Sequence, residues 1–420
     1  MNIKTILKSS VAATALFAVA VPVSTTTAMA ADDSFSSGQK TKLTMSGWVS
    51  RAIWHADDGT SDKTFMSGTP GGSNSRIRWV ASGTLNENVT AGATYEIGMP
   101  EAYTEASATL QGTVITNTGA DGADDATWNI RHEYLWVNHK KFGKLTLGHT
   151  NIGSTGRGEI SATGTDYSRT GRNYGRGLTF VNTTAAANAT SANTVGGVFG
   201  DLDVSRTDVL RYDTPTFFGA RASVARDAAS SVSVGLNWAG KLGGLAVSAG
   251  AGYINQQGGP DASANFTAMG SVSVTHDSGL NVSYQTGKRN FSGPASKSSA
   301  ASAGMPAAVA GAEDTNNLGG RDDPYFHGVQ VGYKAAKLVG VGATAFAVTW
   351  QSSQNMSEND GDATSWSVRV RQNFNALGAH MSLSYQKYNY DAEGEVTVGT
   401  AVNEDYADVD VIALGTVFNF

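Results

Sequence analysis

The chain has 420 residues, with 50 glycines, no cysteine and a formal net charge of −6. Only 16% of its residues are charged, against about 25% in an ordinary globular protein, and its glycine content exceeds the usual ~7%. Lack of cysteine excludes a fold that relies on disulfide bonds, and the acidic balance argues against strong nucleic-acid binding.

Residues 1–30 predict a cleaved secretory signal peptide. Lys4 and Lys8 form a positive start, residues 11–23 are largely apolar, and residues 28–30 (Ala-Met-Ala) form a small-x-small cleavage site. The apolar run is too short to cross a bilayer of about 30 Å as a helix. We therefore expect an exported protein, whose formal charge changes from −6 to −8 when Lys4 and Lys8 are removed. Without disulfides or long apolar helices, it is either a soluble exported protein or an outer-membrane β-barrel.

From Thr41 onward, apolar and polar residues alternate in segments separated by Gly, Asn, Asp and Ser clusters, which is the period-2 pattern of β-strands. Sixteen candidate strands follow: 41–54, 75–86, 89–99, 127–139, 144–150, 205–214, 218–227, 231–240, 244–254, 264–277, 279–291, 325–335, 340–351, 362–374, 377–390 and 408–420. An even number suits a bacterial barrel, because both termini then lie on the periplasmic side.

The connections between these strands alternate between short and long. Short turns follow the even-numbered strands, for example at residues 86–88 and 140–143, whereas long connections follow the first, third, fifth and eleventh strands. A transmembrane barrel needs this alternation of tight periplasmic turns and long outer loops. We therefore predict an all-β fold, a 16-stranded antiparallel transmembrane β-barrel occupying residues 31–420.

The two faces of the predicted strands favour a membrane barrel around water. One face is apolar, and the other carries Arg, Glu, Asn and Gln, which a dry core would reject because unpaired buried charge is costly. Exposed aromatic residues, among them Trp54, Trp238, Trp350 and Trp366, are candidates for girdles at the membrane surfaces.

A long polar segment follows the hairpin that ends at His149. It is rich in Gly, Ser and Thr, and it carries six charged candidates for a constriction: Arg157, Glu159, Asp166, Arg169, Arg172 and Arg176. Structureless connections of this length are uncommon unless they are functional. We expect this third outer loop, about residues 150–200, to fold inward and to control what passes.

Three motifs resemble the general bacterial porins. Residues 206–219 (RTDVLRYDTPTFFG) are similar to the family's strand and turn after the constriction loop, and residues 131–149, with FGKLTLG at 142–148, resemble the hairpin before it. The last strand ends in Phe420, like the signal read by the outer-membrane insertion machinery. Two departures stand out: His149 replaces the family's usual Arg, and the loop has no match to the family's PEFGG core.

The resemblance implies a barrel that is usually a homotrimer in the outer membrane, surrounded by lipid and lipopolysaccharide, with the third outer loop folded into the pore. It also implies that basic wall residues face acidic residues of the loop, here Glu159 and Asp166. Alternation places the following side chains inside the barrel: Arg76, Arg78, Glu96, Arg131, Glu133, Arg211, Asp213 and Arg221. In an alternative interpretation, the arginines pair locally with Glu96 and Glu133 and only stabilise the wall.

The loop arginines leave two interpretations open. Arg157, Arg169, Arg172 and Arg176 make the loop more basic than acidic, which favours anions, but the same residues could equally anchor the loop. No resident cofactor is expected. The seven histidines show no spacing typical of zinc ligands. Acid pairs such as Asp57–Asp58, Asp124–Asp125 and Asp322–Asp323 could bind calcium at the outer surface, although a solvated loop is the simpler interpretation.

We therefore expect a porin for passive diffusion of small hydrophilic solutes and ions. Within the channel class, the alternative is a substrate-specific channel, which would need a track of aromatic or paired basic residues along its lumen. From another class, the alternative is an outer-membrane barrel enzyme such as a lipase or protease, although no nucleophile pair is evident in the sequence. Length and pattern do not determine anion or cation preference.

Overall fold

A computed structural model describes residues 35–37, 41–67, 75–98, 128–165, 175–183, 190–200, 202–204, 206–255, 264–291, 322–357, 361–397 and 400–420. The predicted signal peptide, residues 1–30, lies outside the described residues. Each of the sixteen predicted strands is confirmed, with ends that differ from the prediction by a few residues in most cases. Strand β19 differs most, because it continues to Thr397.

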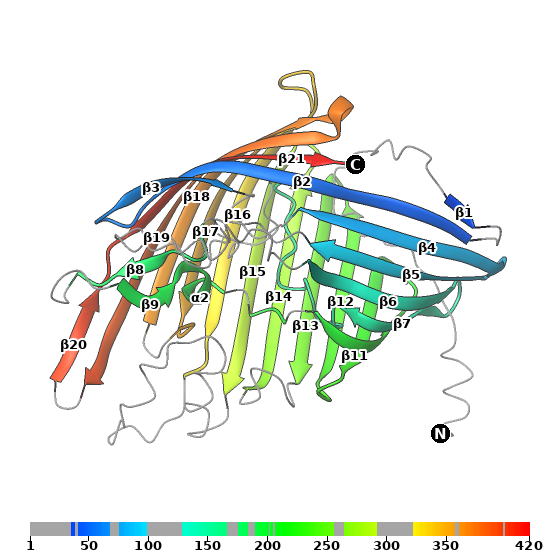
Figure 1. The fold of residues 1–420 in the computed structure, drawn as a ribbon, viewed down its shortest axis with the longest axis horizontal. Helices are drawn as coiled ribbons and strands as arrows, with labels where there is room; N and C mark the ends of the chain where they lie inside the picture. Colours follow the sequence, from blue (N-terminus) through cyan, green and yellow to red (C-terminus); the bar gives the residue numbers. More distant parts are fainter. Residues whose placement is uncertain are drawn as a thin grey trace.

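The sixteen strands form a closed antiparallel barrel (Figure 1). They are β2 (Thr41–Asp57), β4 (Arg76–Asn86), β5 (Val89–Gly98), β6 (Asn129–His139), β7 (Gly143–Thr150), β10 (Thr207–Asp213), β11 (Ala220–Asp227), β12 (Val232–Leu242), β13 (Leu245–Asn255), β14 (Ala264–His276), β15 (Leu280–Phe291), β16 (Tyr325–Ala335), β17 (Thr344–Gln354), β18 (Gly361–Phe374), β19 (Ala379–Thr397) and β21 (Val409–Asn419).

The barrel closes where the first and last strands meet. Strand β21 pairs with β2 from Trp48 opposite Asn419 to Asp57 opposite Asp410, and Figure 1 shows the two strands side by side. Gly47 and Phe420 extend this ladder by exchanging backbone hydrogen bonds of 2.8 and 3.0 Å. Closure satisfies the backbone groups that a sheet edge would leave unpaired, which is the requirement for strands in a membrane.

Alternation gives the wall two chemically different faces. On β12, Val232, Val234 and Leu236 are exposed on the outside, whereas Ser233 between them is buried on the inside. The same order holds on β18, where exposed Trp366 and Val368 alternate with buried Ser367 and Arg369. The outer face therefore suits hydrocarbon and the inner face suits water, as in transmembrane barrels.

The turns at one rim are tight, and glycine makes one of them possible. Residues 140–142 connect β6 to β7, and Gly143 follows with φ of 99°, a conformation that other residues rarely adopt. A side chain at this position would also place its Cβ 2.1 Å from the carbonyl oxygen of Asp213 on the neighbouring strand. Gly143 therefore lets the hairpin of β6 and β7 lie close to β10.

Short elements at both rims and in the long connection complete the described fold. Strand β1 (Phe35–Ser37) pairs with the start of β2, β3 (Asp62–Ser67) folds back on β2, and β20 (Thr400–Asp405) pairs with the end of β19. Between β7 and β10 lie β8 (Thr179–Val181), β9 (Thr190–Thr194) and the four-residue helix α2 (Val195–Val198), and a 3-10 turn, η6 (Asn375–Leu377), joins β18 to β19. Within the described part of the chain, no helix combines the length and the apolar content needed to span a membrane.

Candidate functional site

Three arginines surround one buried carboxylate on the inner face of β4, β5 and β6. The Glu96 side chain has no exposed surface, and its Oε1 lies 3.3 Å from Arg76 Nη1 and 2.9 Å from Arg131 Nε. Its Oε2 accepts a 2.6 Å hydrogen bond from Arg78 Nε and also contacts Arg78 Nη2. These four residues, termed the Glu96 cluster, form a charge-assisted hydrogen-bond network.

Strand register explains how residues far apart in the chain meet in the Glu96 cluster. Arg78 lies directly opposite Glu96 in the ladder of β4 and β5, and Arg76 lies two residues further along the same face. In the ladder of β5 and β6, Glu96 pairs with His132 but Ile97 pairs with Ile130, so Arg131 is the extra residue of a β-bulge. The bulge directs Arg131 to the carboxylate of Glu96.

The same bulge makes the predicted inward position of Glu133 wrong. Glu133 pairs with Tyr95 and is exposed on the outer face, where it shares parity with Leu135 and Val137. Strict alternation placed Arg131 and Glu133 on one face, but the extra residue between them reverses the parity. The predicted local pairing of the arginines is therefore realised through Glu96 and not through Glu133.

A second ionic group lies on the inner face of β10 and β11. Arg211 Nη2 is 2.7 Å from Asp213 Oδ1, and Arg221 Nη2 is 3.2 Å from Asp213 Oδ2. Ser223 Oγ donates a 2.6 Å hydrogen bond to the same carboxylate. Arg211 and Arg221 thus both pair with Asp213; all three residues were predicted to face inward, and they are termed the Asp213 cluster.

Two cations near these clusters escaped the sequence analysis. Lys144 lies opposite Asp213 in the ladder of β7 and β10, and its Nζ is 5.5 and 5.2 Å from the ring centroids of Tyr134 and Trp136. Arg206, just before β10, interacts electrostatically with Arg76. Alternation with Leu145 was the available signal for Lys144. Arg206 fell inside the predicted strand 205–214, where it shares parity with the outward Leu210, but in the structure it precedes β10, so alternation does not fix its direction.

The long connection first runs along the inner wall. Residues 151–165, termed the wall segment, hydrogen-bond to inward side chains of β12, β14, β15 and β16. Gly153 N donates to Ser233 Oγ (2.9 Å), Ile160 N donates to Ser271 Oγ (3.0 Å), and Gln285 Nε2 donates to the carbonyl of Ile160 (3.2 Å). Ser161 Oγ also contacts the amide of Gln330 on β16. Small inward residues let the segment approach: a Cβ on Gly235 would lie 2.0 Å from the Gly153 carbonyl oxygen.

Arg157 anchors the wall segment near the Asp213 cluster. Its Nη2 donates to Ser223 Oγ at 3.3 Å, and the neighbouring Gly156 N donates to Asp203 Oδ2 at 2.8 Å. Burial, together with the positive charge of Arg211, lowers the pKa of the Arg157 guanidinium to about 10, so it remains protonated at neutral pH. Glu159, two residues further, is partly buried in the same segment.

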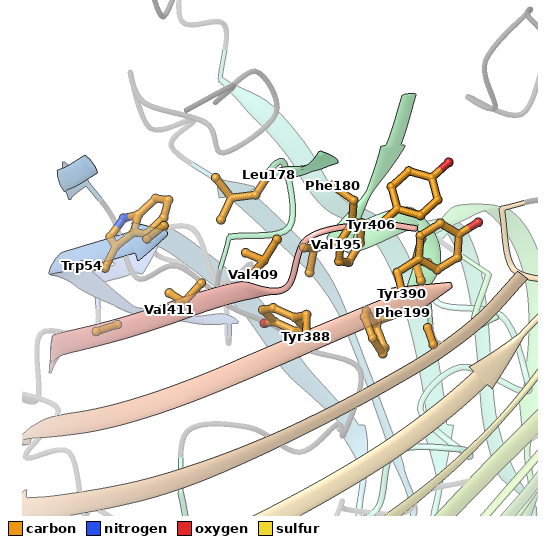
Figure 2. Packing of buried hydrophobic residues seen from close by; sticks show 14 of the residues in the cluster. Trp54, Leu178, Phe180, Val195, Phe199, Tyr388, Tyr390, Tyr406, Val409 and Val411 are labelled. Carbon is orange, nitrogen blue, oxygen red and sulfur yellow. The ribbon is translucent and has the colours of Figure 1, made fainter. Parts of the chain in front are cut away.

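The connection then packs on a different part of the inner wall through apolar contacts. Leu178, Phe180, Val195, Val198 and Phe199 are buried against inward side chains of β2, β19 and β21 (Figure 2). The wall contributes, among others, the residues Trp54, Tyr388, Tyr390, Val409 and Val411. Backbone hydrogen bonds reinforce this contact, with Ala407 N donating to the carbonyl of Val181 at 2.9 Å.

Trp54 belongs to this buried contact and is not a girdle residue. Its exposed fraction is 2%, and its ring stacks on Phe65 with centroids 4.0 Å apart. Parity with Ala52 and Ala56 directs it inward, where it packs against the loop segment. Trp350 and Trp366, by contrast, are exposed on the outer face as a girdle requires.

Four predicted loop residues remain, of which Arg176 belongs to the described residues. Asp166, Arg169 and Arg172 lie outside the described residues. Arg176 is exposed, and its carbonyl accepts a 2.8 Å hydrogen bond from Gly196 N. The wall arginines therefore meet a wall carboxylate, Glu96, at the position where a loop carboxylate was expected.

The predicted calcium positions show carboxylates with protein partners. Asp58 Oδ1 accepts hydrogen bonds from Thr60 and Ser61, and Asp323 pairs with Lys288 at 2.9 Å. Asp124 and Asp125 lie outside the described residues. Among the residues that the structure describes, no group of three or more His, Asp or Glu side chains is arranged to hold a metal ion.

A family model described as Gram-negative porin matches residues 12–393. No curated protein matches the chain in sequence.

Solved structures share the architecture at low identity. An anion-selective porin from Comamonas acidovorans is 13% identical and has a TM-score of 0.53, covering 90% of this chain and 100% of its own. OmpF of Salmonella typhi in complex with daunomycin is 14% identical with a TM-score of 0.52, covering 92% and 99%. The trimer form of OmpT, an outer-membrane protein of Vibrio cholerae, is 14% identical with a TM-score of 0.52, covering 91% and 100%. At these identities the likeness is one of fold.

Proposed function

The chain belongs to the Gram-negative porin family and forms a diffusion channel in the outer membrane, and we propose that it passes small hydrophilic solutes through a lumen narrowed by the connection after β7. Passage is passive and is determined by the size and charge of the solute. The proposed constriction corresponds to about residues 150–200, and the barrel domain corresponds to residues 31–420.

The observation that carries the proposal is the double attachment of this connection to the inner wall. The wall segment, residues 151–165, is hydrogen-bonded to inward side chains of β12, β14, β15 and β16. Leu178, Phe180, Val195, Val198 and Phe199 are buried against β2, β19 and β21. Both parts occupy interior volume that water and solutes would otherwise fill, which reduces the cross-section of the channel.

The two attachments differ in chemistry, and this difference supports a stable constriction. Polar contacts on the β12–β16 wall satisfy backbone groups of a segment that has no regular structure. The apolar contact around Phe180 removes large side chains from water and therefore resists displacement by solutes.

We propose that the pore-lining residues come from the wall and from the connection. The wall contributes Arg76, Arg78, Glu96, Arg131, Arg211, Asp213 and Arg221, and the connection contributes Arg157, Glu159, Asp166, Arg169, Arg172 and Arg176. Opposed or unequal charges across a narrow passage create a field that favours polar solutes over apolar ones.

Planar-bilayer conductance of the refolded protein tests the proposal. Wild-type protein is expected to produce stepwise, roughly ohmic channels, and deletion of residues 157–176 is expected to raise the unit conductance. Deletion of residues 300–315, in another long connection, serves as the matched control and should leave the conductance near the wild-type value. Unchanged conductance after the first deletion would contradict an inward constriction.

We also propose that the barrel assembles as a homotrimer, surrounded by lipid and lipopolysaccharide. A groove on the outer face of β2, β4–β7 and β10, with a volume of about 620 Å³, is lined by Leu43, Tyr95, Leu135 and other apolar residues but also by the charged Glu133 and Asp208. Charged side chains are costly against lipid, and a second copy of the chain would cover them. The OmpT structure described as a trimer form supports this assembly.

Sedimentation in detergent would measure the assembly state of the protein. The proposed homotrimer predicts a species of three times the mass of the mature chain, and Leu135→Arg in the groove should shift it toward monomers. A monomeric wild-type protein would contradict the proposal.

Two other functions make different predictions. A substrate-specific channel would show saturable transport of one solute and would use the paired arginines of the lumen as its track. An outer-membrane barrel enzyme would hydrolyse lipid or peptide, and one Ser or His substitution would abolish that activity.

A further inference from the structure

Building on the proposed diffusion channel, we infer that the lumen is an anion pathway and that its solutes are small molecules carrying carboxylate or phosphate groups. The inference rests on which charges face the interior and on how far each charge is covered.

Acidic groups of the inner wall are buried beneath arginines. In the Glu96 cluster the Glu96 side chain is 0% exposed, whereas Arg78 is 43% exposed and Arg131 is 15% exposed. In the Asp213 cluster the carboxylate is 4% exposed and Arg211 is 11% exposed. An ion in the lumen therefore meets guanidinium groups first, and each carboxylate acts as the counter-ion that holds them in place.

Cations also outnumber carboxylates in each cluster. Three arginines contact Glu96 and two contact Asp213. Lys144 and Arg157 add positive charge beside Asp213. The two clusters lie on one wall, with β6 and β7 between Glu96 and Asp213, so positive charge extends across this part of the inner wall.

A third basic position lies on another part of the wall. Lys334 of β16 lies beside the wall segment, because a Cβ on Gly164 would be 3.6 Å from the Lys334 Cδ. Arg371 of β18 interacts electrostatically with Lys334. Cations thus border the interior on more than one side.

Many acidic residues that give the chain its net charge of −6 lie elsewhere. Glu133, Asp362 and Asp391 are exposed on strands, and Glu87 and Asp277 are exposed in turns. These five carboxylates therefore lie outside the two interior clusters, in each of which arginines outnumber the carboxylate. The overall charge does not report the charge seen by a permeating ion.

Guanidinium chemistry specifies the class of solute. The planar, permanently charged fork of arginine matches the two oxygens of a carboxylate or the oxygens of a phosphate. A single cation at about 8 Å from the path, across screened water, changes the ratio of anion to cation permeability about twofold to sixfold.

Zero-current potentials of the full-length mature protein in a KCl gradient test the inference. Wild-type channels should prefer chloride, and Arg78→Gln should shift the permeability ratio toward potassium by about twofold to sixfold. Arg78→Lys retains the charge and should retain the preference. Arg226→Gln removes the same charge from an exposed position on β11 outside the clusters and should have no effect.

The outcomes separate this inference from the proposed function. Stepwise channels that prefer potassium would overturn the anion pathway and leave the diffusion channel intact. Absence of channels would overturn the diffusion channel and the anion pathway with it. Inorganic phosphate and succinate, added separately, probe the class of solute. A decrease in chloride current with either anion, weaker in Arg78→Gln than in wild type, supports oxyanion recognition. If neither anion decreases the chloride current, oxyanion recognition is overturned.

Discussion

Replacing Glu96 with Gln would remove the carboxylate that three arginines share. The amide keeps the size of the side chain but not its charge. Arg76 Nη1 at 3.3 Å and Arg131 Nε at 2.9 Å would each lose the Glu96 carboxylate while remaining 9% and 15% exposed. Arg78 is 43% exposed and would relax into water, so it contributes less to the loss.

The expected magnitude follows from the two buried guanidinium groups. Removal of one partner from a buried ion pair costs about 3 to 5 kcal/mol, because the other charge is left without compensation. Here the remaining arginines also repel one another. We therefore expect Glu96→Gln to lower the free energy of unfolding by about 3 to 5 kcal/mol.

Equilibrium unfolding by urea in phospholipid vesicles, followed by tryptophan fluorescence, measures this change. Glu133→Gln is the matched control, because Glu133 lies on the neighbouring strand but on the exposed outer face. Its effect should remain within about 0.5 kcal/mol. If the free energy of unfolding of Glu96→Gln lay within about 1 kcal/mol of the wild-type value, or if the two variants were equally destabilised, the reasoning from burial would be refuted.

Three further predictions address the connection after β7. Phe180→Ala should destabilise its apolar attachment by about 3 to 5 kcal/mol and make the unit conductance larger or noisier, whereas Phe218→Ala, at a fully exposed turn, should be neutral in both measurements. Gly235→Ala places a Cβ 2.0 Å from the Gly153 carbonyl oxygen and should displace the wall segment and raise conductance, whereas Gly270→Ala, whose Cβ would be 3.5 Å from its nearest neighbour, should not. The pKa of Arg157 is lowered to about 10, so its positive charge is lost as pH rises through that value. Chloride preference of the wild-type channel should therefore fall in a step near this pH, and the step should be missing in Arg157→Gln. Equal pH profiles for both proteins would argue against a pore-facing charge at this position.

Local pattern was sufficient for the strands. Alternation of apolar and polar residues with period 2 is a property of neighbouring residues, so all sixteen barrel strands could be predicted, and short turns predicted the antiparallel order. Parity likewise placed Arg76 and Arg78 together on one face, where both contact Glu96.

Parity failed where the ladder is irregular. One extra residue at Arg131 turned Glu133 outward, and nothing in the sequence around it marks a bulge. Trp54 also departed from its predicted role, because a loop more than a hundred residues away in the chain covers the inner face of β2. Register shifts and loop packing depend on contacts between distant segments, which a local pattern does not encode.

By itself, the sequence determined an exported all-β chain, the positions of its strands and the motifs of its family. Only the tertiary structure decided that Glu96 lies beneath three arginines, that Asp213 lies beneath two more, and that many exposed acids lie on the outer face and in turns. The net charge of the chain does not indicate which charged side chains point into the barrel and which point out of it. Closure of the barrel assigns each side chain to water inside or to the surroundings outside, and so determines which charges a permeating solute encounters.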